Sequence, residues 1–269
     1  MMRLGHILGF VLLMCAILHS FDVRAQSTTN RFKTGEKLSY GVYYHLMGVW
    51  VAAGDVTFSV QEDIFKDRSC YKFTGFGKTH KRYDWFYKVR DTYESYADKS
   101  GLVPYRFRRD VNEGDYYFVE DCIFDHPAER ILSVLKVKEQ DIKVDTSTLE
   151  PESFDVLSMI YHARTLDFAS FTVGDRIPIK MFIDRETHPL FIRFLGTEVY
   201  DHSEFGEVEC YVFSPLLVEG TIFQSGEKMK VYVTKDSNVI PIYVESEIRV
   251  GSIRAELTAH EGLLAPLGQ

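Results

Sequence analysis

The sequence predicts a mostly β protein, with a large antiparallel curved sheet or open barrel built in two halves around one central helix. Two long regions alternate apolar and polar residues with a period of two, and one segment between them has helical spacing. Aromatic residues make up 14% of the 269 residues, a content that suits sheets and apolar cavities. No linker rich in Pro, Gly or Ser separates the regions. We therefore expect a single β-rich domain over residues 26–269, with halves at about 35–145 and 172–260.

The first 25 residues have the features of a secretory signal peptide. A basic start at Arg3 precedes an apolar stretch from Ile7 to Leu18, and Val23 and Ala25 are spaced as signal peptidase requires. We expect cleavage after Ala25 and export to the periplasm or to the periplasmic face of the outer membrane.

Two alternatives to cleavage remain open. A membrane anchor needs roughly 20 apolar residues, and this stretch is shorter and is followed directly by His19. A lipoprotein signal would use Cys15, but Met14 before it is larger than the small residue that such processing prefers. No later run of about 18 apolar residues is present, so we expect a soluble or peripheral mature protein.

The N-terminal half reads as successive short strands with one buried face. Leu38, Tyr40, Val42 and Tyr44 share one face, and Val56, Phe58 and Val60 repeat this pattern. Further runs rich in aromatic and β-branched residues cover 70–78, 85–96, 104–111, 116–124 and 130–138. Turn residues separate these runs at 98–101, 112–115 and 125–127. Strands this close in sequence should be antiparallel neighbours.

One helix is predicted between the halves, at about 153–164. Val156, Leu157, Ile160 and Tyr161 fall on one helical stripe. Ser153 is expected as the N-cap, with the Asp155 carboxylate in the first turn at the positive end of the helix dipole. A helix this short is marginal alone, so its apolar stripe should lie against the sheet.

The period-two pattern resumes in the C-terminal half. Ile177, Ile179, Met181 and Ile183 share one face, and later runs cover 189–200, 207–214, 228–234, 239–248 and 252–259. Turn residues at 205–206, 225–226, 236–238 and 250–251 separate them.

Several segments resemble an exported bacterial family of unknown function, domain-of-unknown-function family 3108. The similar segments are 35–40 followed by Ala53 and Gly54, the helix 155–164, and the closing hairpin at 234–241 and 251–257. The resemblance implies a β-rich fold, no established activity and no catalytic residue. Its architecture is more loosely similar to the periplasmic carriers and receptors of lipoproteins, which are open β half-barrels closed by helices. Those carriers have several helices, whereas this sequence predicts one.

Charge and cysteine usage restrict the function classes. A net charge of −8 argues against nucleic acid as a partner. After cleavage three isolated cysteines would remain: Cys70, Cys122 and Cys210. All three lie in strand-like runs, where a buried and inert thiol is expected. A Cys70–Cys122 disulfide is an open alternative. No metal-ligand spacing, nucleophile motif or phosphate loop is found, so we expect no cofactor, no metal and no catalytic residue.

The leading hypothesis is an exported, non-catalytic protein that binds a lipid or other hydrophobic ligand beneath the helix. The candidate ligand-lining residues are Tyr40, Tyr44, Phe58, Phe73, Leu157, Ile160 and Tyr161. The same rings could instead fill an ordinary packed core. The candidate patch for an anionic headgroup combines cations and an aromatic ring: Lys81, Arg82, Trp85, Arg106 and Arg108. The same residues could equally serve to pair strands through cation–π contacts.

The alternatives are an envelope scaffold or protein-interaction module without a cavity, and, second, a hydrolase of envelope glycans. A continuous apolar void between helix and sheet would distinguish the ligand binder from the scaffold. Peripheral contact with the envelope remains open for both.

Overall fold

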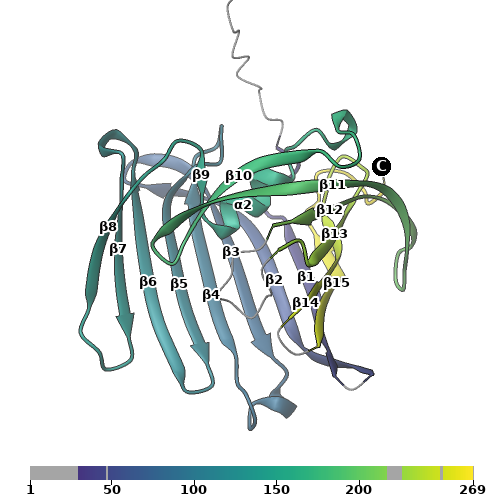
Figure 1. The fold of residues 1–269 in the computed structure, drawn as a ribbon, viewed down its shortest axis with the longest axis horizontal. Coiled ribbons are helices and arrows are strands. Elements are labelled where there is room, and N and C mark those ends of the chain that lie inside the picture. The colour runs from purple at the N-terminus through teal and green to yellow at the C-terminus, as the bar shows by residue number, and fades with distance from the viewer. Residues whose placement is uncertain (1–29, 47, 217–225, 249–250, 269) are drawn as a thin grey trace, which may run out of the picture.

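The computed structural model describes residues 30–46, 48–216, 226–248 and 251–268, and the predicted leader lies outside them. Within these residues, the strands form a single 15-stranded sheet (Figure 1). The strands are β1 (Lys37–Leu46), β2 (Val49–Phe65), β3 (Arg68–Thr79), β4 (Arg90–Ala97), β5 (Pro104–Glu113), β6 (Tyr116–Asp125), β7 (Arg130–Val137), β8 (Lys143–Thr148), β9 (Ser153–Phe154), β10 (Arg176–Ile183), β11 (Glu186–His202), β12 (Gly206–Pro215), β13 (Met229–Thr234), β14 (Pro241–Glu247) and β15 (Ser252–Glu261). The helix α2 (Val156–Ala163) is accompanied by three 3₁₀ turns, η1 (Lys81–Tyr83), η2 (His126–Ala128) and η3 (Phe168–Ser170).

The first and last strands of the chain are neighbours in the middle of the sheet. The strand order runs from β8 down to β1, then from β15 down to β9, so β8 and β9 are the two edges. Neighbouring strands pair antiparallel, except that β9 pairs parallel with β10. The sheet is therefore two meanders joined at β1 and β15, which confirms the predicted antiparallel sheet with an open edge.

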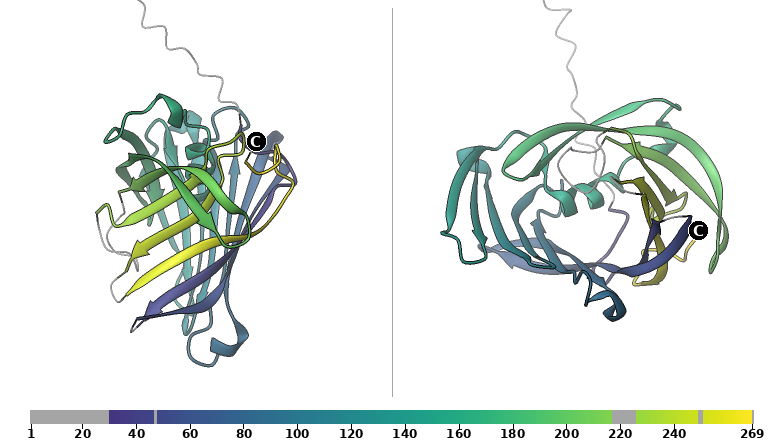
Figure 2. Two further views of the ribbon diagram at one scale, coloured as in Figure 1. Left: turned by 90° about the vertical axis from the view of Figure 1, so that its right-hand side faces the viewer. Right: turned by 60° about the horizontal axis from the view of Figure 1, so that its bottom comes forward.

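Register shifts mark the points where the sheet bends. They occur between β1 and β15 at Ser39/Tyr40, between β1 and β2 at Val42/Tyr43, between β4 and β5 at Tyr96/Ala97, between β11 and β12 at Phe194/Gly196, and between β13 and β14 at Tyr232/Val233. A bulge bends its strand and increases the local twist. The accumulated bending wraps the sheet around α2 (Figure 2).

The helix lies inside the curved sheet, against β3, β4, β9 and β10. Its close approach to β3 depends on Gly75, where a Cβ would lie 3.3 Å from Leu157 Cδ2 and 3.3 Å from Phe58 Cε1. The glycine thus makes room for the apolar stripe of the helix. A helix this short depends on such tertiary contacts for its stability.

The N-cap differs from the prediction. Asp155, not Ser153, caps the helix: its Oδ1 accepts hydrogen bonds from the backbone N–H groups of Leu157 (2.8 Å) and Ser158 (3.0 Å). Ser158 Oγ accepts from the Asp155 N–H, which completes a capping box. Ser153 is instead extended in β9, because pairing with Lys180 of β10 keeps its backbone in the strand.

We expect Asp155 to make the protein more stable on acidification. Burial raises the pKa of this carboxyl from 3.8 to about 6, despite hydrogen bonds from Ser95 and Ser158 that oppose the shift. Because the folded-state pKa is the higher one, the stabilisation is full below about pH 4 and is lost as the pH rises through about 6. The size of the effect should be on the order of 1–3 kcal/mol.

Urea unfolding at pH 7 and pH 4.5 tests this expectation, with Asp155→Asn as the matched variant. Asparagine keeps the capping oxygen but carries no charge, so its pH dependence should be weaker than that of the native chain. Asp155→Ala should lose about 1–2 kcal/mol at both pH values through the lost cap. Equal pH dependence in the native chain and Asp155→Asn would contradict the assignment.

Two strand predictions need correction. Residues 85–89, expected at the start of a strand, form a loop, and β4 begins at Arg90. The edge strands β8 and β9 were not predicted; β8 is polar and mostly exposed, and β9 has two residues, so neither has a clear alternating pattern.

The cysteines Cys70, Cys122 and Cys210 are free and buried in the structure. Burial raises the pKa of all three thiols, to about 12 for Cys122 and Cys210. They therefore remain protonated and unreactive at neutral pH, as the sequence predicts, and no Cys70–Cys122 bridge is formed.

Candidate ligand cavity

A cavity of about 560 Å³ lies between α2 and the inner face of one half of the sheet. Its wall comes from β1, β2 and β10–β15, with α2 along one side. The volume falls within the roughly 300–1,000 Å³ of small-molecule sites. Nearly all of the lining side chains are aliphatic or aromatic, including those of Val42, Phe58, Leu190 and Val244.

The helix lies between a packed cluster of the N-terminal half and the cavity. Leu157 and Tyr161 are buried against the strands of the N-terminal half, where Tyr161 stacks on Phe73 with ring centroids 4.0 Å apart. Met159 and Ile160 border the cavity and remain half-buried, although they point into the curved sheet. Further buried clusters lie on the C-terminal half, around Phe168 and around Ile240, and the cavity is the space that these clusters and the helix leave unfilled.

The structure places four of the seven predicted ligand-lining residues at the cavity. Tyr40, Phe58, Ile160 and Tyr161 border it. Two others, Phe73 and Leu157, lie in the packed core on the other side of the helix, where they are 0% and 2% exposed.

The seventh, Tyr44, is absent from the cavity wall. It follows Tyr40 and Val42 on β1, beyond the bulge at Val42/Tyr43. The predicted faces of β1 and β2 are otherwise correct, since Leu38, Val42 and Val56 also line the cavity.

Two of the three charged residues in the described wall are in ion pairs. Arg164 pairs with Glu36, and Asp184 pairs with Arg109. The Arg254 guanidinium lies 4.8 Å and 4.5 Å from the ring centroids of Tyr43 and Trp50, residues that do not line the cavity. Arg254 makes no ion pair with a described residue, and its buried Nε has no hydrogen-bond partner, so it is the one unpaired charge in an otherwise apolar wall over the described residues.

Arg164 borders the cavity at the C-terminal end of α2 and is held by several hydrogen bonds. Its Nη1 and Nη2 donate to the Glu36 carboxylate at 2.5 and 2.9 Å, and Nη2 also donates to the carbonyl oxygens of Arg31 and Asn238 at 3.0 Å each. Burial disfavours the Arg164 charge, but the Glu36 carboxylate outweighs it and raises the Arg164 pKa. Sequence reasoning missed this pair, since the partners are 128 residues apart and no local pattern marks either one.

A second ion cluster joins the two halves across the open edge. Arg109 of β5 is buried and pairs with Glu120 of β6 and with Asp184, at 2.7 Å, from the β10–β11 turn. In the same turn, the carbonyl oxygen of Arg185 accepts a hydrogen bond from Ser147 Oγ of β8 at 2.8 Å. The turn thereby holds the C-terminal half against the N-terminal half.

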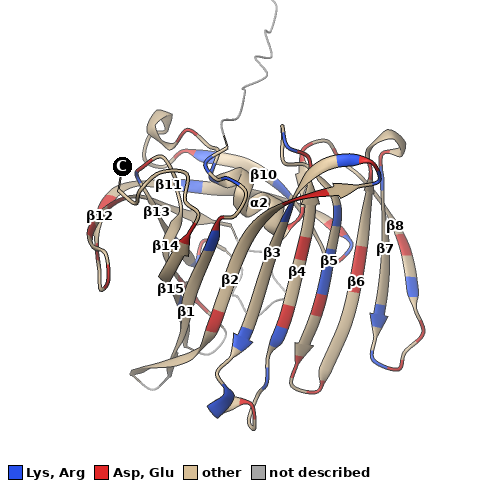
Figure 3. Ribbon diagram, turned by 180° about the vertical axis from the view of Figure 1, so that it is seen from behind, with Lys and Arg blue, Asp and Glu red and all other residues tan. Residues whose placement is uncertain are grey.

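The structure does not bring the five predicted headgroup residues together. Lys81, Arg82 and Trp85 lie in the β3–β4 loop, whereas Arg106 and Arg108 lie on β5 opposite Tyr96 and Glu94, away from that loop. Arg106 pairs with Asp121 at 2.5 Å and Arg108 with Asp110 at 3.1 Å. Acidic and basic positions lie close together along β4, β5 and β6 (Figure 3). Arg106 therefore links β5 to β6, Arg108 pairs within β5, and the loop residues form a separate group.

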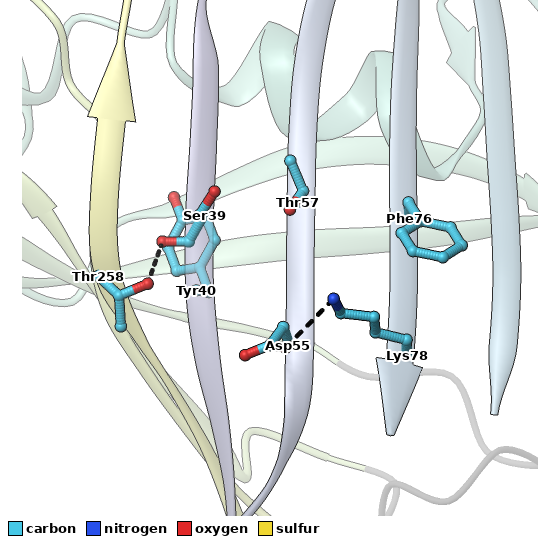
Figure 4. Close-up of a pocket in the computed structure, with 7 residues that line it drawn as sticks. All are labelled: Ser39, Tyr40, Asp55, Thr57, Phe76, Lys78 and Thr258. Carbon is cyan, nitrogen blue, oxygen red and sulfur yellow. Dashed lines mark hydrogen bonds and ion pairs between the residues drawn. The ribbon is translucent and has the colours of Figure 1, made fainter. Parts of the chain in front are cut away.

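A smaller pocket of about 220 Å³ lies outside the sheet, over β15, β1, β2 and β3 (Figure 4). Thr258 Oγ1 donates to the carbonyl oxygen of Ser39 at 3.1 Å, and Asp55 lies 3.7 Å from Lys78 and 3.3 Å from His80. These groups satisfy one another on a solvated surface. We assign this pocket no ligand.

Within the described part of the chain, no cluster of three His, Cys, Asp or Glu side chains is placed to hold a metal ion. Over the same residues, none of the helices has the length and apolar character needed to cross a bilayer.

Comparison with known proteins bears on the family and the fold. Residues 39–258 match the model of the family described as "Protein of unknown function (DUF3108)". The chain belongs to the DUF3108 family. This confirms the resemblance found in the sequence. No curated protein sequence matches the chain.

A solved structure shares the fold. The chain is similar to a β-barrel-like protein of domain of unknown function DUF1849 from Brucella abortus, with a TM-score of 0.56 and 9% sequence identity. The match covers 86% of this chain and 98% of that one. At this identity the likeness shows the barrel-like fold that this DUF3108 chain adopts, and it carries no activity.

Proposed function

We propose that this DUF3108 chain is an exported, non-catalytic protein that binds a lipid or other long hydrophobic molecule in the cavity beside α2. The observation that carries the proposal is the cavity itself: about 560 Å³, walled mainly by apolar side chains, with Arg164 and Asp184 already in ion pairs. A ligand that enters removes apolar surface from water, which contributes roughly 2.5 kcal/mol for each 100 Å² buried. This driving force is non-directional, so it needs no catalytic or charged group.

The cavity supports this hypothesis over the scaffold hypothesis. An envelope scaffold functions through its edges and loops, so nothing in that role requires apolar space in its interior. Unfilled space between helix and sheet costs dispersion contacts, since its lining has no partner atoms on one side. A bound ligand would restore those contacts.

Native mass spectrometry of the full chain, expressed with its N-terminal segment and purified from the envelope, tests ligand and export together. We expect a lipid-sized mass that stays bound at low collision energy, on a polypeptide that begins at Gln26. Clean apoprotein would favour the scaffold, and a polypeptide that retains residues 1–25 would contradict the proposed cleavage.

Filling the cavity should abolish binding of a neutral apolar probe. Ala255 and Val244 border the cavity on β15 and β14, so Ala255→Phe with Val244→Phe inserts two rings into the space. We expect the affinity for N-phenyl-1-naphthylamine, read from its fluorescence, to fall at least about tenfold, which corresponds to about 1.4 kcal/mol.

Thr57→Phe is the matched control, because Thr57 lines the outer pocket on β2. It adds one ring outside the sheet instead of inside it, and probe affinity should remain native. Equal probe affinity in the native and filled chains, with folding intact by circular dichroism, would place the probe elsewhere and refute the cavity as the binding site.

A further inference from the structure

The β3–β4 loop, residues 80–89, presents two aromatic side chains to solvent. Trp85 is 84% exposed and Phe86 is 78% exposed, the highest values among the large apolar side chains in the described part of the chain. The loop projects beyond the ends of the neighbouring strands (Figures 1 and 2). The two ring centroids are 5.9 Å apart in an edge-to-face arrangement, so the rings form one apolar tip.

The base of the loop is fixed by hydrogen bonds. Asp84 accepts from Thr79 Oγ1 at 3.0 Å and from Arg90 Nη2 at 2.7 Å. The carbonyl oxygen of Lys88 accepts from the Gly114 N–H at 2.7 Å, which ties the loop to the β5–β6 turn. The loop conformation therefore holds the two rings outward, with no core for them to enter.

Cations surround the apolar tip. Residues 80–90 contain four Lys or Arg and one carboxylate, in a chain whose net charge is −8. The carboxylate, Asp84, is paired with Arg90. Lys81 and Lys88 are exposed and make no ion pair with any described residue. Figure 3 shows the basic η1 turn at this end of the molecule.

We propose that this loop docks the protein on an anionic lipid bilayer, with Trp85 and Phe86 inserted at the level of the headgroups and Lys81 and Lys88 against the lipid phosphates. Indole rings favour the bilayer interface because one part is apolar and the N–H finds a polar partner there. Basic residues beside an inserted apolar tip add attraction to an anionic surface. Arg90 is held by Asp84 and Arg82 donates to the carbonyl oxygen of Ala52, which leaves Lys81 and Lys88 to face an anionic surface.

Docking would also orient the cavity. The loop follows the end of β3, where Thr79 pairs with Gly54 near the start of β2. The cavity-lining residue Ile253 lies near the start of β15, paired with Tyr44 close to the same end of the sheet. The bilayer would then face the end of the curved sheet where Ile253 and the neighbouring part of the cavity wall lie.

Tryptophan fluorescence tests the docking directly. The chain contains two tryptophans, Trp50 and Trp85. In Trp50→Phe, Trp85 is the only reporter. We expect its emission to shift to shorter wavelength, and to be quenched by brominated phosphatidylcholine, when vesicles contain phosphatidylglycerol. Vesicles of phosphatidylcholine alone should bind much more weakly.

Variants separate insertion from nonspecific adsorption in a vesicle co-sedimentation assay. Trp85→Ala with Phe86→Ala should lower the partition coefficient about a hundredfold, since each of the two rings contributes on the order of a tenfold change. Lys81→Glu with Lys88→Glu should lower it similarly at low salt. Ile64→Ala and Lys66→Glu are the controls, because these residues are exposed at the opposite end of β2 and should leave binding unchanged.

Two results would overturn the proposal. One is no binding to either vesicle, which would assign the exposed rings to a protein partner. The other is binding that survives the loss of both rings. Probe binding in the cavity should be native in Trp85→Ala with Phe86→Ala, so failure of the docking proposal is distinguishable from failure of the proposed cavity function.

Discussion

Glu36→Gln should lower the free energy of unfolding by about 3–5 kcal/mol, because it leaves the Arg164 guanidinium buried without its carboxylate. The side chains of Glu36 and Arg164 are 0% and 2% exposed. Arginine does not deprotonate in proteins, so the charge cannot be removed by a shift of its protonation. The carbonyl oxygens of Arg31 and Asn238 still accept from Arg164, but neither carries the opposite charge.

The large effect follows from the number of segments that meet at Arg164. It ends α2, while Glu36 precedes β1 and Asn238 lies between β13 and β14. The guanidinium also lies 5.6 Å from the Phe32 ring centroid and 5.4 Å from that of Tyr161. Loss of the pair therefore loosens the contact of the helix with both meanders at once.

A double-mutant cycle in urea separates the pair from its surroundings. Glu36→Gln combined with Arg164→Met should cost less than the sum of the two single changes, because the double variant buries no unpaired charge. Asp121→Asn is the control for a partly exposed pair, with Arg106, and should cost much less. If Glu36→Gln costs no more than Asp121→Asn, the pair is not buried in solution.

The architecture could be predicted from the sequence because strand and helix periodicities are local. A period of two identifies which face of each strand is buried, as in Leu38, Tyr40 and Val42, and short turns make neighbouring strands antiparallel. The spacing of Leu157 and Tyr161 likewise identifies the buried stripe of α2.

The division between core and cavity could not be predicted in this way. Tyr40 and Phe73 have the same signature, an inward-facing ring in a strand, yet the first borders the cavity and the second is packed against Tyr161. The difference depends on where α2 lies across the sheet, and therefore on distant features such as the space at Gly75 and the Glu36–Arg164 pair.

The exposed aromatic loop between β3 and β4 could not be predicted from the sequence for a related reason. Trp85, Phe86 and Tyr87 read as the beginning of a strand, since strands are enriched in aromatic residues. The structure places them in the loop between β3 and β4. The sequence did contain one indication of a loop: charged residues flank the rings on both sides, at Lys81, Arg82 and Lys88. Charges on both sides are unusual for a buried strand.

Phe73→Ala should be the most destabilising single truncation among the predicted ligand-lining residues, with a loss of about 3–5 kcal/mol. Phe73 is 0% exposed, stacks on Tyr161 and meets Phe32 edge to face with centroids 5.5 Å apart. Removing the ring leaves a void that these neighbours, held by the sheet and the helix, cannot close. Urea unfolding with far-ultraviolet circular dichroism measures the loss.

Met181→Ala is the matched comparison, since Met181 borders the cavity and is only half-buried. Its side chain has open space on one side and so fewer dispersion contacts to lose, and we expect a cost well below that of Phe73→Ala. We expect the opposite order for the binding of N-phenyl-1-naphthylamine. Met181→Ala should change the probe affinity more, because it reshapes the cavity wall. Phe73→Ala, studied at urea concentrations below its unfolding midpoint, should leave the probe affinity unchanged. A Phe73→Ala chain that is fully stable but binds the probe poorly would mean that the helix packs the other way round, with Phe73 on the ligand side. The contrast between these two side chains therefore tests the position of α2, on which both the cavity and the proposed ligand depend.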